Sequence, residues 1–562
     1  FYIFIRRKIF VMRISLFLIF LLFFNISFSQ TTQTIALPLQ PPLQLTSNFA
    51  EYRSGRFHIG LDFRTYDKND RRIFSVWDGY VSRVRFNSAS YGRAVYISHP
   101  NGYTSVYGHL SSFSPEIDSL VTNYQYKNKT FETDIYLSQN TIKIKKGQPI
   151  GIAGNSGYSF GEHLHFEIRD TKTSDPLNPL MFFQTNDKRK PIFNQIGIYS
   201  LQSGGFLPAN VDLYKTILHG ETYTTLKEIY VPDTFFIGID VQDFQSLSYR
   251  LLPRIIEVLI DDILVWKADF DRYSFYLDSN CKGIFDHNLG LNKKKQIVLT
   301  YSGNVPNTLF YKKISKKGLF TLKDSLPHKL TIIATDAESN SSTLNTTIIK
   351  NKKSSPHSNN KYKIFNHQFN TFNTENISIE LNINSFYGDM ALEQPFLIEK
   401  KIDNELVWTI GSKELPILKS FKVIFNKNNF ISNKTLFIQT DNSNKIIKSY
   451  KPTKDSKGNW FVKMNNTGDF KLFEDTVPPK IYKNNISSLN TAPTNDIIFY
   501  VSDNSGVIKS YNAYVDGVWQ LMIYDFKYDQ FTIPLKKNQK IEKLHVTFTD
   551  IVGNKTEKTF LF

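Results

Sequence analysis

GEHLHFEIR, at residues 161–169, alternates polar and apolar side chains from His163 onward. A period of two is typical of a β-strand that packs one face and leaves the other available. His163 and His165 therefore share a face with Glu167, and same-face neighbours lie about 6.5–7 Å apart. One imidazole could bind a metal ion while the other stands beside the open position of that ion. An isolated pair of this kind is more often two surface histidines. A metal site is therefore indicated only if other segments of the chain supply further ligands.

Two earlier segments supply further polar residues of the same chemistry. RFHIGLDFRT, at residues 56–65, places His58 and Asp62 on one face, with Gly60 between them. We expect this glycine to leave room for an ion or a substrate backbone to approach closely. AVYISHPNGYTSVYGHL, at residues 94–110, predicts a β-hairpin with an Asn-Gly turn, and its return strand ends near His109.

These residue types fit the requirements of a catalytic zinc site. Such a site uses three protein ligands and keeps a fourth position for water or substrate. Cys281 is the only cysteine, which excludes disulfides within the chain and a site of several thiolates, and leaves His, Asp and Glu as ligands. The chain has no H-E-x-x-H motif, so spare histidines would have to provide acid–base catalysis.

The order of these motifs resembles that of a known family. H-x-G-x-D, then Y-x-H-L, then G-Q-x-I-G-x-x-G-x-S-G-x-x-x-G-x-H-L-H-F-E resembles the lysostaphin-type (LytM-like) zinc metallopeptidases over roughly residues 45–182. The resemblance implies a small antiparallel β-sheet groove with one Zn²⁺ on its floor. It implies His58, Asp62 and His165 as the metal ligands. It implies His109 and His163 as the catalytic pair for acid–base chemistry and transition-state stabilisation.

The resemblance also implies a substrate. Members of the family cut peptide bonds in the stems or crosslinks of peptidoglycan, and D-alanyl–diaminopimelate crosslinks are the expected target in a Gram-negative-like cell. Relatives that have lost the metal ligands activate other wall hydrolases. The alternative function is therefore a non-catalytic adaptor, and a secreted adhesin is a third class. All five positions are filled here, which favours an active metalloendopeptidase.

Other residues near the motifs have less specific interpretations. His99 lies at the hairpin turn, and we expect a structural role for it. Glu167 could accept a hydrogen bond from a ligand imidazole and so orient it, or form a cross-strand salt bridge with a basic residue. Residues 113–141 are longer than the link that is usual in the family. They are expected either to rim or cover the groove, or to form a tolerated surface loop.

The chain is mainly β and too long for one core at 562 residues. The predicted peptidase domain covers residues 30–185. Two segments share an order of strands that closes with Thr-Asp-x-x-x-Asn, at TDAESN (335–340) and TDIVGN (549–554). This repeat predicts immunoglobulin-like β domains at 186–350 and 476–562, with a linker at 351–375 and a β-sandwich-like domain at 376–475. We expect no amphipathic helix longer than about three turns.

The first 29 residues predict a secretory signal peptide with Met12 as the true start, and an uncleaved anchor is the alternative. Export follows, with the periplasm expected and the cell surface or secretion as alternatives. Membrane contact is then expected only through this segment. The formal charge of +17 comes from scattered lysines without a basic track of exposed aromatics, so nucleic acid is not an expected partner. Protein partners could bind the C-terminal β domains.

Overall fold

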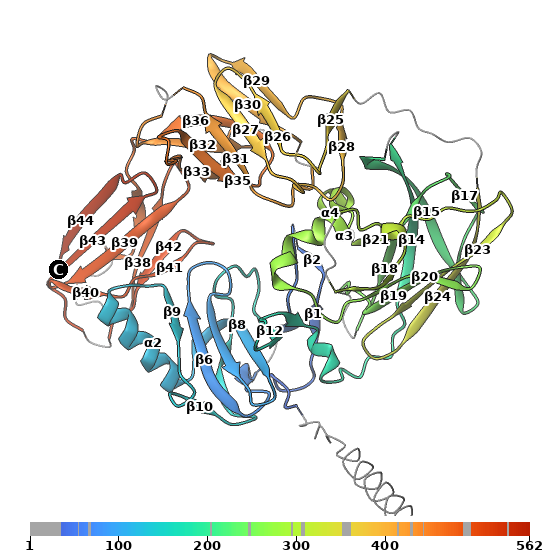
Figure 1. Cartoon of the computed structure of the whole chain (residues 1–562). Helices are drawn as coiled ribbons and strands as arrows, with labels where there is room; N and C mark the ends of the chain where they lie inside the picture. Colours follow the sequence, from blue (N-terminus) through green and yellow to red (C-terminus); the bar gives the residue numbers. More distant parts are fainter. Residues whose placement is uncertain are drawn as a thin grey trace, which may run out of the picture.

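The computed structural model describes residues 35–562 except 54, 66–68, 203–204, 246–248, 294–295, 305–308, 351–360, 413–414, 428–430, 442, 487–495 and 537–538. The predicted signal peptide at 1–29 lies outside the described residues. Among the described helices, none combines the length and apolar character needed to cross a bilayer. The prediction of a mainly β chain is confirmed, because β-sheets build every domain of the described chain (Figure 1).

The N-terminal domain is built on an 11-stranded sheet. Its main path runs β1 (Leu45–Ser47), β4 (Leu61–Arg64), β12 (His163–Asp170), β8 (Tyr103–Phe113), β7 (Arg93–Ser98), β6 (Gly79–Phe86) and β10 (Lys143–Ile144). The other strands of this sheet are β5 (Arg72–Phe74), β9 (Thr133–Tyr136), β11 (Pro149–Ala153) and β13 (Pro176–Leu177), and β2 (Tyr52–Arg53) pairs separately with β3 (Arg56–Phe57).

Strand β12 (residues 163–170) contains most of the stretch GEHLHFEIR and is the third strand of this path. Leu164, Phe166 and Ile168 of β12 are fully buried in the hydrophobic core, as the alternation predicts. His165 and Glu167 on the polar face are buried as well, so this face is less available than the sequence indicated. In the paired strands, His165 lies opposite Asp62 of β4 and opposite Gly108 of β8. The predicted hairpin is β7–β8, and Gly102 at its turn adopts φ +85°.

Residues 113–141 contain a helix that the sequence did not predict. Helix α2 (Pro115–Asn128) spans 14 residues, about four turns, where we expected none longer than about three. It buries Ile117, Val121 and Gln125, which follow one another at a spacing of four. Strand β9 then pairs with β6, so the insertion lies on the β6 side of the sheet. Helix α2 contacts β8, the neighbour of β12, as well as β9. The role of the insertion as a rim or cover of the groove stays a prediction, as does the alternative of a tolerated surface loop.

The second domain follows the 3-10 helix η1 (Pro179–Met181) and shares a 13-stranded sheet with two strands of the next domain. Its strands are β14 (Ile192–Gln202), β15 (Phe206–His219), β16 (Thr222–Thr225), β17 (Ile229–Val231), β18 (Phe236–Gln242), β19 (Ile255–Ile260), β20 (Ile263–Asp269), β21 (Ile297–Leu299), β22 (Tyr311–Ile314), β23 (His328–Thr335) and β24 (Ser341–Lys350). Its short helices are η2 (Phe275–Asn280), α3 (Cys281–Ile284), α4 (His287–Lys293) and η3 (Lys316–Gly318).

The third domain is a sandwich of two five-stranded sheets around one core. One sheet contains β26 (Asn370–Asn373), β27 (Ile377–Leu381), β31 (Phe421–Phe425), β35 (Trp460–Met464) and β34 (Thr453–Lys454), and the other contains β29 (Leu397–Ile402), β30 (Glu405–Ile410), β36 (Gly468–Glu474), β32 (Thr435–Thr440) and β33 (Ile446–Tyr450). Strands β25 (Tyr362–Ile364) and β28 (Met390–Leu392) join it to β15. The predicted linker 351–375 therefore contains two strands, and residues 351–360 lie outside the described chain.

The C-terminal domain is a sandwich of two four-stranded sheets. Its strands are β37 (Lys480–Asn484), β38 (Ile497–Ser502), β42 (Gln530–Ile533) and β41 (Ile523–Asp525) in one sheet, and β40 (Val518–Gln520), β39 (Ile508–Val515), β43 (Lys543–Asp550) and β44 (Lys555–Leu561) in the other. An immunoglobulin-like topology for the second and fourth domains stays a prediction.

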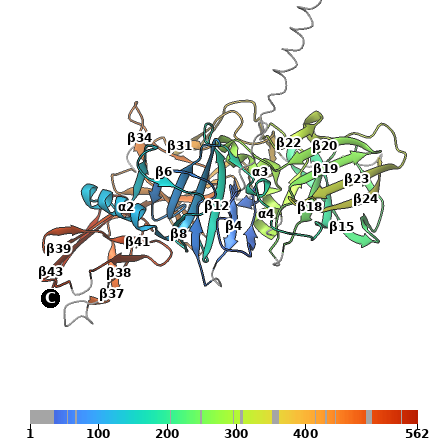
Figure 2. The same ribbon diagram turned by 90° about the horizontal axis from the view of Figure 1, so that it is seen from below.

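The four domains close into a ring, in which the last one returns to the first (Figure 1). Both views place α2 beside the C-terminal domain (Figure 2). There Tyr126 contacts Trp519 edge-on, with ring centroids 5.5 Å apart, and its hydroxyl donates to Gln520 Oε1 at 3.2 Å. One hydrophobic core runs from the first domain into the second and includes Trp519 and Leu521 of the fourth. The insertion is therefore a docking element between domains.

Candidate metal centre and active site

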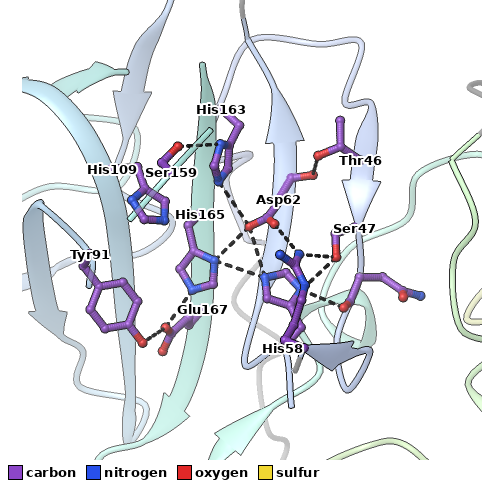
Figure 3. Close-up of polar contacts among 12 residues, drawn as sticks. Thr46, Ser47, His58, Asp62, Tyr91, His109, Ser159, His163, His165 and Glu167 are labelled. Carbon is purple, nitrogen blue, oxygen red and sulfur yellow. Dashed lines mark hydrogen bonds and ion pairs between the residues drawn. The ribbon is translucent and has the colours of Figure 1, made fainter. Parts of the chain in front are cut away.

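The carboxylate of Asp62 is the point on which the polar side chains converge (Figure 3). Its Oδ1 lies 3.1 Å from His58 Nε2 and 2.9 Å from His165 Nδ1, and these two nitrogens are 3.2 Å apart. All three side chains are buried, at 5–7% exposure. They come from three places, namely the segment before β4, β4 itself and β12.

The donor set fits a divalent zinc ion. Ligand atoms around a tetrahedral zinc lie about 3.3 Å apart when the bonds are about 2.0–2.1 Å long. One atom from each of His58, Asp62 and His165 lies within 4.8 Å of the others. Two imidazole nitrogens and one carboxylate oxygen are the ligands of many catalytic zinc sites with an open fourth position.

Neighbouring groups fix the ligand rings in the orientation that such a site needs. His58 Nδ1 lies 2.7 Å from the Asn48 carbonyl, to which it donates, so Nε2 faces Asp62. The side chain of Asn48 in turn exchanges two hydrogen bonds with the backbone of Leu252, at 2.8 and 2.9 Å. Arg53 donates to Asp62 Oδ2 at 2.7 Å, which leaves Oδ1 for the centre. The second domain therefore holds a group that orients His58.

Glu167 orients His165 from the other side. Its Oε1 accepts from His165 Nε2 at 2.8 Å and from the Tyr91 hydroxyl at 2.6 Å, while Oε2 accepts from Arg169 Nε at 2.6 Å. Glu167 is fully buried. Glu167 thus accepts from the His165 imidazole as one interpretation predicted, whereas its ion pair is with Arg169 of the same strand and not across strands. His165 thus presents Nδ1 to Asp62 and His58.

His109 and His163 lie beside this centre with matching hydrogen bonds. His109 Nδ1 donates to the Ser156 carbonyl at 2.8 Å, and His163 Nδ1 donates to the Gly161 carbonyl at 2.8 Å. The ring centroids are 4.9 Å apart, and His163 Nε2 is 3.5 Å from Asp62 Oδ1. Each ring therefore keeps Nε2 as the nitrogen that can exchange a proton.

A β-bulge places His109. The pairing of β7 with β8 shifts between Arg93 and Val95, which leaves one extra residue in β8 at Gly108–His109. His109 adopts φ +62°, a left-handed conformation that is uncommon for residues other than glycine. A bulge bends a strand and redirects a side chain, and bulges are frequent next to active sites. Here it turns His109 toward His163.

The electrostatics of the centre favour a cation. Burial lowers the pKa of His58 to about 4 and that of His109 to about 3, so both rings are neutral near pH 7. Burial opposes a charge on His165, but hydrogen bonds to Asp62 and Glu167 outweigh it and raise its pKa to about 9. Glu167 stays ionised, because Arg169 and His165 overcome its burial and lower its pKa to about 2. A bound metal ion would take the place of the His165 proton.

The structure brings together the five residues that the sequence predicted for the site, namely His58, Asp62, His109, His163 and His165. His99, for which we expected a structural role, lies apart from them. His99 Nδ1 donates to the Asp78 carbonyl at 2.8 Å, and Nε2 accepts from Ser105 Oγ at 2.7 Å, away from the centre. The expectation for Gly60 is wrong. A Cβ there would come within 2.4 Å of the Phe166 carbonyl oxygen, so the glycine admits strand β12 rather than an ion.

Sequence reasoning missed four residues that support the centre: Ser47, Asn48, Arg53 and Tyr91. Of these four, only Tyr91 could have been suggested by the sequence, because it lies just before the predicted hairpin and an aromatic side chain there could reach β12. The other three lie in or next to the short strands β1 and β2, and Asn48 is held in place by Leu252 of the second domain.

Comparison with known proteins defines the class of the N-terminal domain. Residues 56–129 match the profile of peptidase family M23. The N-terminal part of the chain is thus similar to the M23 peptidases over the segment that carries His58, Asp62 and His109.

The relatives are similar to this chain over part of its length. The chain is 30% identical over 125 residues to the DD-carboxypeptidase/endopeptidase Mpg of Neisseria meningitidis, which is 22% of each chain. It is 32% identical over 149 residues to an uncharacterised metalloprotease of Haemophilus influenzae, covering 25% of this chain and 26% of that protein. A solved zinc-containing peptidase from Vibrio cholerae is 28% identical, with a TM-score of 0.19 over 25% of this chain and 37% of the other. The chain thus spans about a quarter of the length of the curated relatives.

Proposed function

We propose that this protein is a zinc-dependent endopeptidase that hydrolyses peptide crosslinks of bacterial peptidoglycan. The observation that carries the proposal is the convergence of His58 Nε2, Asp62 Oδ1 and His165 Nδ1 within 2.9–3.2 Å, with two further imidazoles beside them. The similarity to the DD-carboxypeptidase/endopeptidase Mpg of Neisseria meningitidis supports peptidoglycan peptides as the substrate class. The predicted export through residues 1–29, with the periplasm as the compartment, belongs to the same proposal.

The residues divide into holding and reacting groups. His58, Asp62 and His165 would hold one zinc ion, which supplies a Lewis acid that polarises the scissile carbonyl. His109 and His163 act on protons. Because burial keeps His109 neutral, its Nε2 can accept the proton of the attacking water. The pair then returns a proton to the leaving amine and donates hydrogen bonds to the oxyanion that develops on the substrate.

Digestion of purified sacculi by the full-length protein tests this function. The wild-type protein should contain one zinc per chain and release muropeptides whose crosslinks have been cut. His165→Ala should lose both zinc and activity. His163→Ala should keep its zinc and lose roughly 10²–10⁴-fold in rate, the range for a positioned acid–base group.

The control is His367→Ala, since the His367 side chain is 63% exposed and lies in the third domain. It should match the wild type. An adaptor would cut no crosslink in any form and would instead raise the activity of a separate amidase. That pattern would overturn the enzyme assignment.

A further inference from the structure

Three carboxylates meet at the junction between the third and fourth domains. Asp475 directly follows β36, Asp503 directly follows β38, and Asp550 is the last residue of β43. One oxygen atom from each lies within 4.8 Å of the others. Asp475 and Asp550 are fully buried, at 0% exposure. Like charges this close repel one another unless something between them compensates.

Each carboxylate has one satisfied and one unsatisfied oxygen. The Oδ1 atoms accept hydrogen bonds from backbone amides in short turns, which fix the three side chains in place. The Oδ2 atoms of all three are buried and have no hydrogen-bond partner. A buried carboxylate oxygen without a partner is costly, and the usual compensation is pairing or metal coordination. The donors are Val477 N to Asp475, Ser505 N to Asp503, and Val552 N, Gly553 N and Asn554 N to Asp550.

The basic residue nearest this triad does not compensate it directly. Lys434 donates to the Asn554 amide oxygen, and Asn554 Nδ2 donates to the Asp475 carbonyl at 2.9 Å. The Asn504 side-chain amide also donates a hydrogen bond to Asp475. Lys434 thus reaches the triad only through Asn554.

The same arrangement occurs a second time in the chain. Asp187, Asp243 and Asp336 also offer oxygens within 4.8 Å of one another, at the junction between the first and second domains. Asp243 is 5% exposed, and its Oδ1 has no hydrogen-bond partner.

The two triads match residue by residue. Asp187 and Asp475 each stand four residues before the proline that precedes the first strand, at Pro191 and Pro479. The asparagine of Thr-Asp-x-x-x-Asn repeats its contact, since Asn340 Nδ2 donates to the Asp187 carbonyl at 3.1 Å, as Asn554 Nδ2 does to that of Asp475. Strand packing alone would not require three acidic side chains at both junctions.

We propose that each triad binds one Ca²⁺ ion. Oxygen-only donors suit a hard cation, and calcium–oxygen bonds of about 2.3–2.6 Å place ligand oxygens up to about 5 Å apart, as they are here. Magnesium usually keeps several of its waters, which a triad with two fully buried carboxylates disfavours. The ions would stiffen the two junctions and so hold the domains of the ring in one arrangement.

Calcium titration of the zinc-loaded full-length chain tests this proposal. The protein is freed of metals on a chelating resin and reloaded with one equivalent of zinc. CaCl₂ is then added in a calorimeter, with MgCl₂ in a parallel run. We expect saturation at two Ca²⁺ per chain, with Kd on the order of 10⁻⁵–10⁻³ M and at least tenfold weaker magnesium binding. Asp550→Asn should remove one ion and Asp336→Asn the other, because an amide can keep the turn hydrogen bonds but loses the anionic oxygen.

Asp516→Asn is the matched control. Asp516 also accepts two backbone hydrogen bonds in a turn of the fourth domain, from Glu542 and Lys543, but it belongs to neither triad. It should still bind two ions. Should Asp550→Asn disturb folding, Asp503→Asn tests the same site from a less buried position. Limited proteolysis adds a structural readout, since calcium should slow cleavage near residues 475–479 several-fold in the wild type and not in Asp550→Asn. Absence of saturable calcium binding, or two ions bound by Asp550→Asn, would overturn the proposal.

Discussion

Asp62 organises the candidate centre at the scale of single residues. Three imidazole nitrogens lie within 3.5 Å of its Oδ1, while Arg53 binds its Oδ2. The two oxygens therefore have separate tasks, because one faces the centre and the other fixes the carboxylate. The buried Glu167 does the same for His165, as it bonds the ring with one oxygen and Arg169 with the other.

The first prediction concerns Glu167→Gln. The substitution keeps the shape of the side chain but removes the charge that holds the His165 ring, so zinc affinity should fall roughly 10–100-fold, the range for partners of metal ligands. Competition with a chromophoric chelator measures this affinity. Glu162→Gln is the control, because Glu162 lies one residue before β12 and pairs with Arg71 at 2.6 Å at the surface. An equal loss in both variants would contradict the role of Glu167.

The five central residues could be predicted because each stands in a short motif whose order along the chain is informative. His58, Asp62 and His165 lie on polar faces of alternating segments, and local periodicity indicates such faces. Asn48 and Arg53 could not be predicted. Asn48 is placed by its hydrogen bond to Leu252 of the second domain, and Arg53 of the two-residue strand β2 reaches Asp62 through the tertiary fold, so no local pattern in the sequence predicts either contact.

At the scale of elements, the close approach of β4 and β12 builds the centre. Their pairing sets Asp62 opposite His165, and a slip by one residue would move one of them to the apolar face. Gly60 makes the approach possible, because the Phe166 carbonyl and Glu167 Cγ occupy the space where its Cβ would be.

Gly60→Ala should therefore impair the centre. The added methyl group would meet the Phe166 oxygen at 2.4 Å and push the segment of His58 and Asp62 away from β12. We expect about 1–3 kcal/mol of destabilisation from overpacking and at least tenfold weaker zinc binding. Thermal unfolding and chelator competition measure the two effects.

Gly161→Ala is the matched control for this substitution. A Cβ at Gly161 has nothing within 4 Å, although the residue is next to the same strand and its carbonyl binds His163. It should behave like the wild type. If the two alanine variants bind zinc equally well, close packing at Gly60 is not what positions Asp62.

Helix α2 shows why an element can escape prediction. Only Ile117, Val121 and Gln125 of its 14 residues are buried, and the last of these is polar. Its exposed aromatic residue Tyr126 contacts Trp519, which is almost four hundred positions further along the chain. Because few of its residues face a core, α2 has a weak apolar stripe, and the periodicity of the sequence alone did not predict it.

At the scale of the whole molecule, the ring connects the active-site loop with the C-terminal domain. Phe526 stacks on Tyr158 with ring centroids 6.0 Å apart and planes at 2°, and Lys527 Nζ donates to the Asn155 carbonyl. The loop at residues 155–161 carries the carbonyls that hold His109 and His163. The fourth domain thus braces the loop that orients His109 and His163.

The double variant Phe526→Ala/Lys527→Ala should therefore separate catalysis from metal binding. Without the brace, the loop orients His109 and His163 less well, so we expect kcat to fall about 3–30-fold, a modest fraction of the effect of a whole acid–base group. Zinc affinity should stay within twofold. Tyr528→Ala is the control, since Tyr528 is 62% exposed on the same turn. Unchanged kcat in the double variant would show that the contact has no catalytic role.

The domain order could be predicted from strand patterns and the Thr-Asp-x-x-x-Asn repeat, but the closure of the ring could not. Closure depends on contacts between side chains of different domains, such as Tyr126 and Trp519. Nothing in the sequence around either residue indicates that the two meet. The shared core of the first two domains also means that residues 30–185 leave an apolar surface uncovered when expressed alone. Experiments on the enzyme therefore need the full chain.

The central claim is that His58, Asp62 and His165 hold one zinc ion. Zinc K-edge X-ray absorption of the full-length protein, loaded with one equivalent of zinc, tests it most directly. We predict a first shell of nitrogen and oxygen at about 2.0–2.2 Å with the multiple-scattering signature of two imidazoles. His165→Ala should lose one imidazole or the metal itself. A shell without imidazole, or a spectrum that His165→Ala leaves unchanged, would contradict the claim.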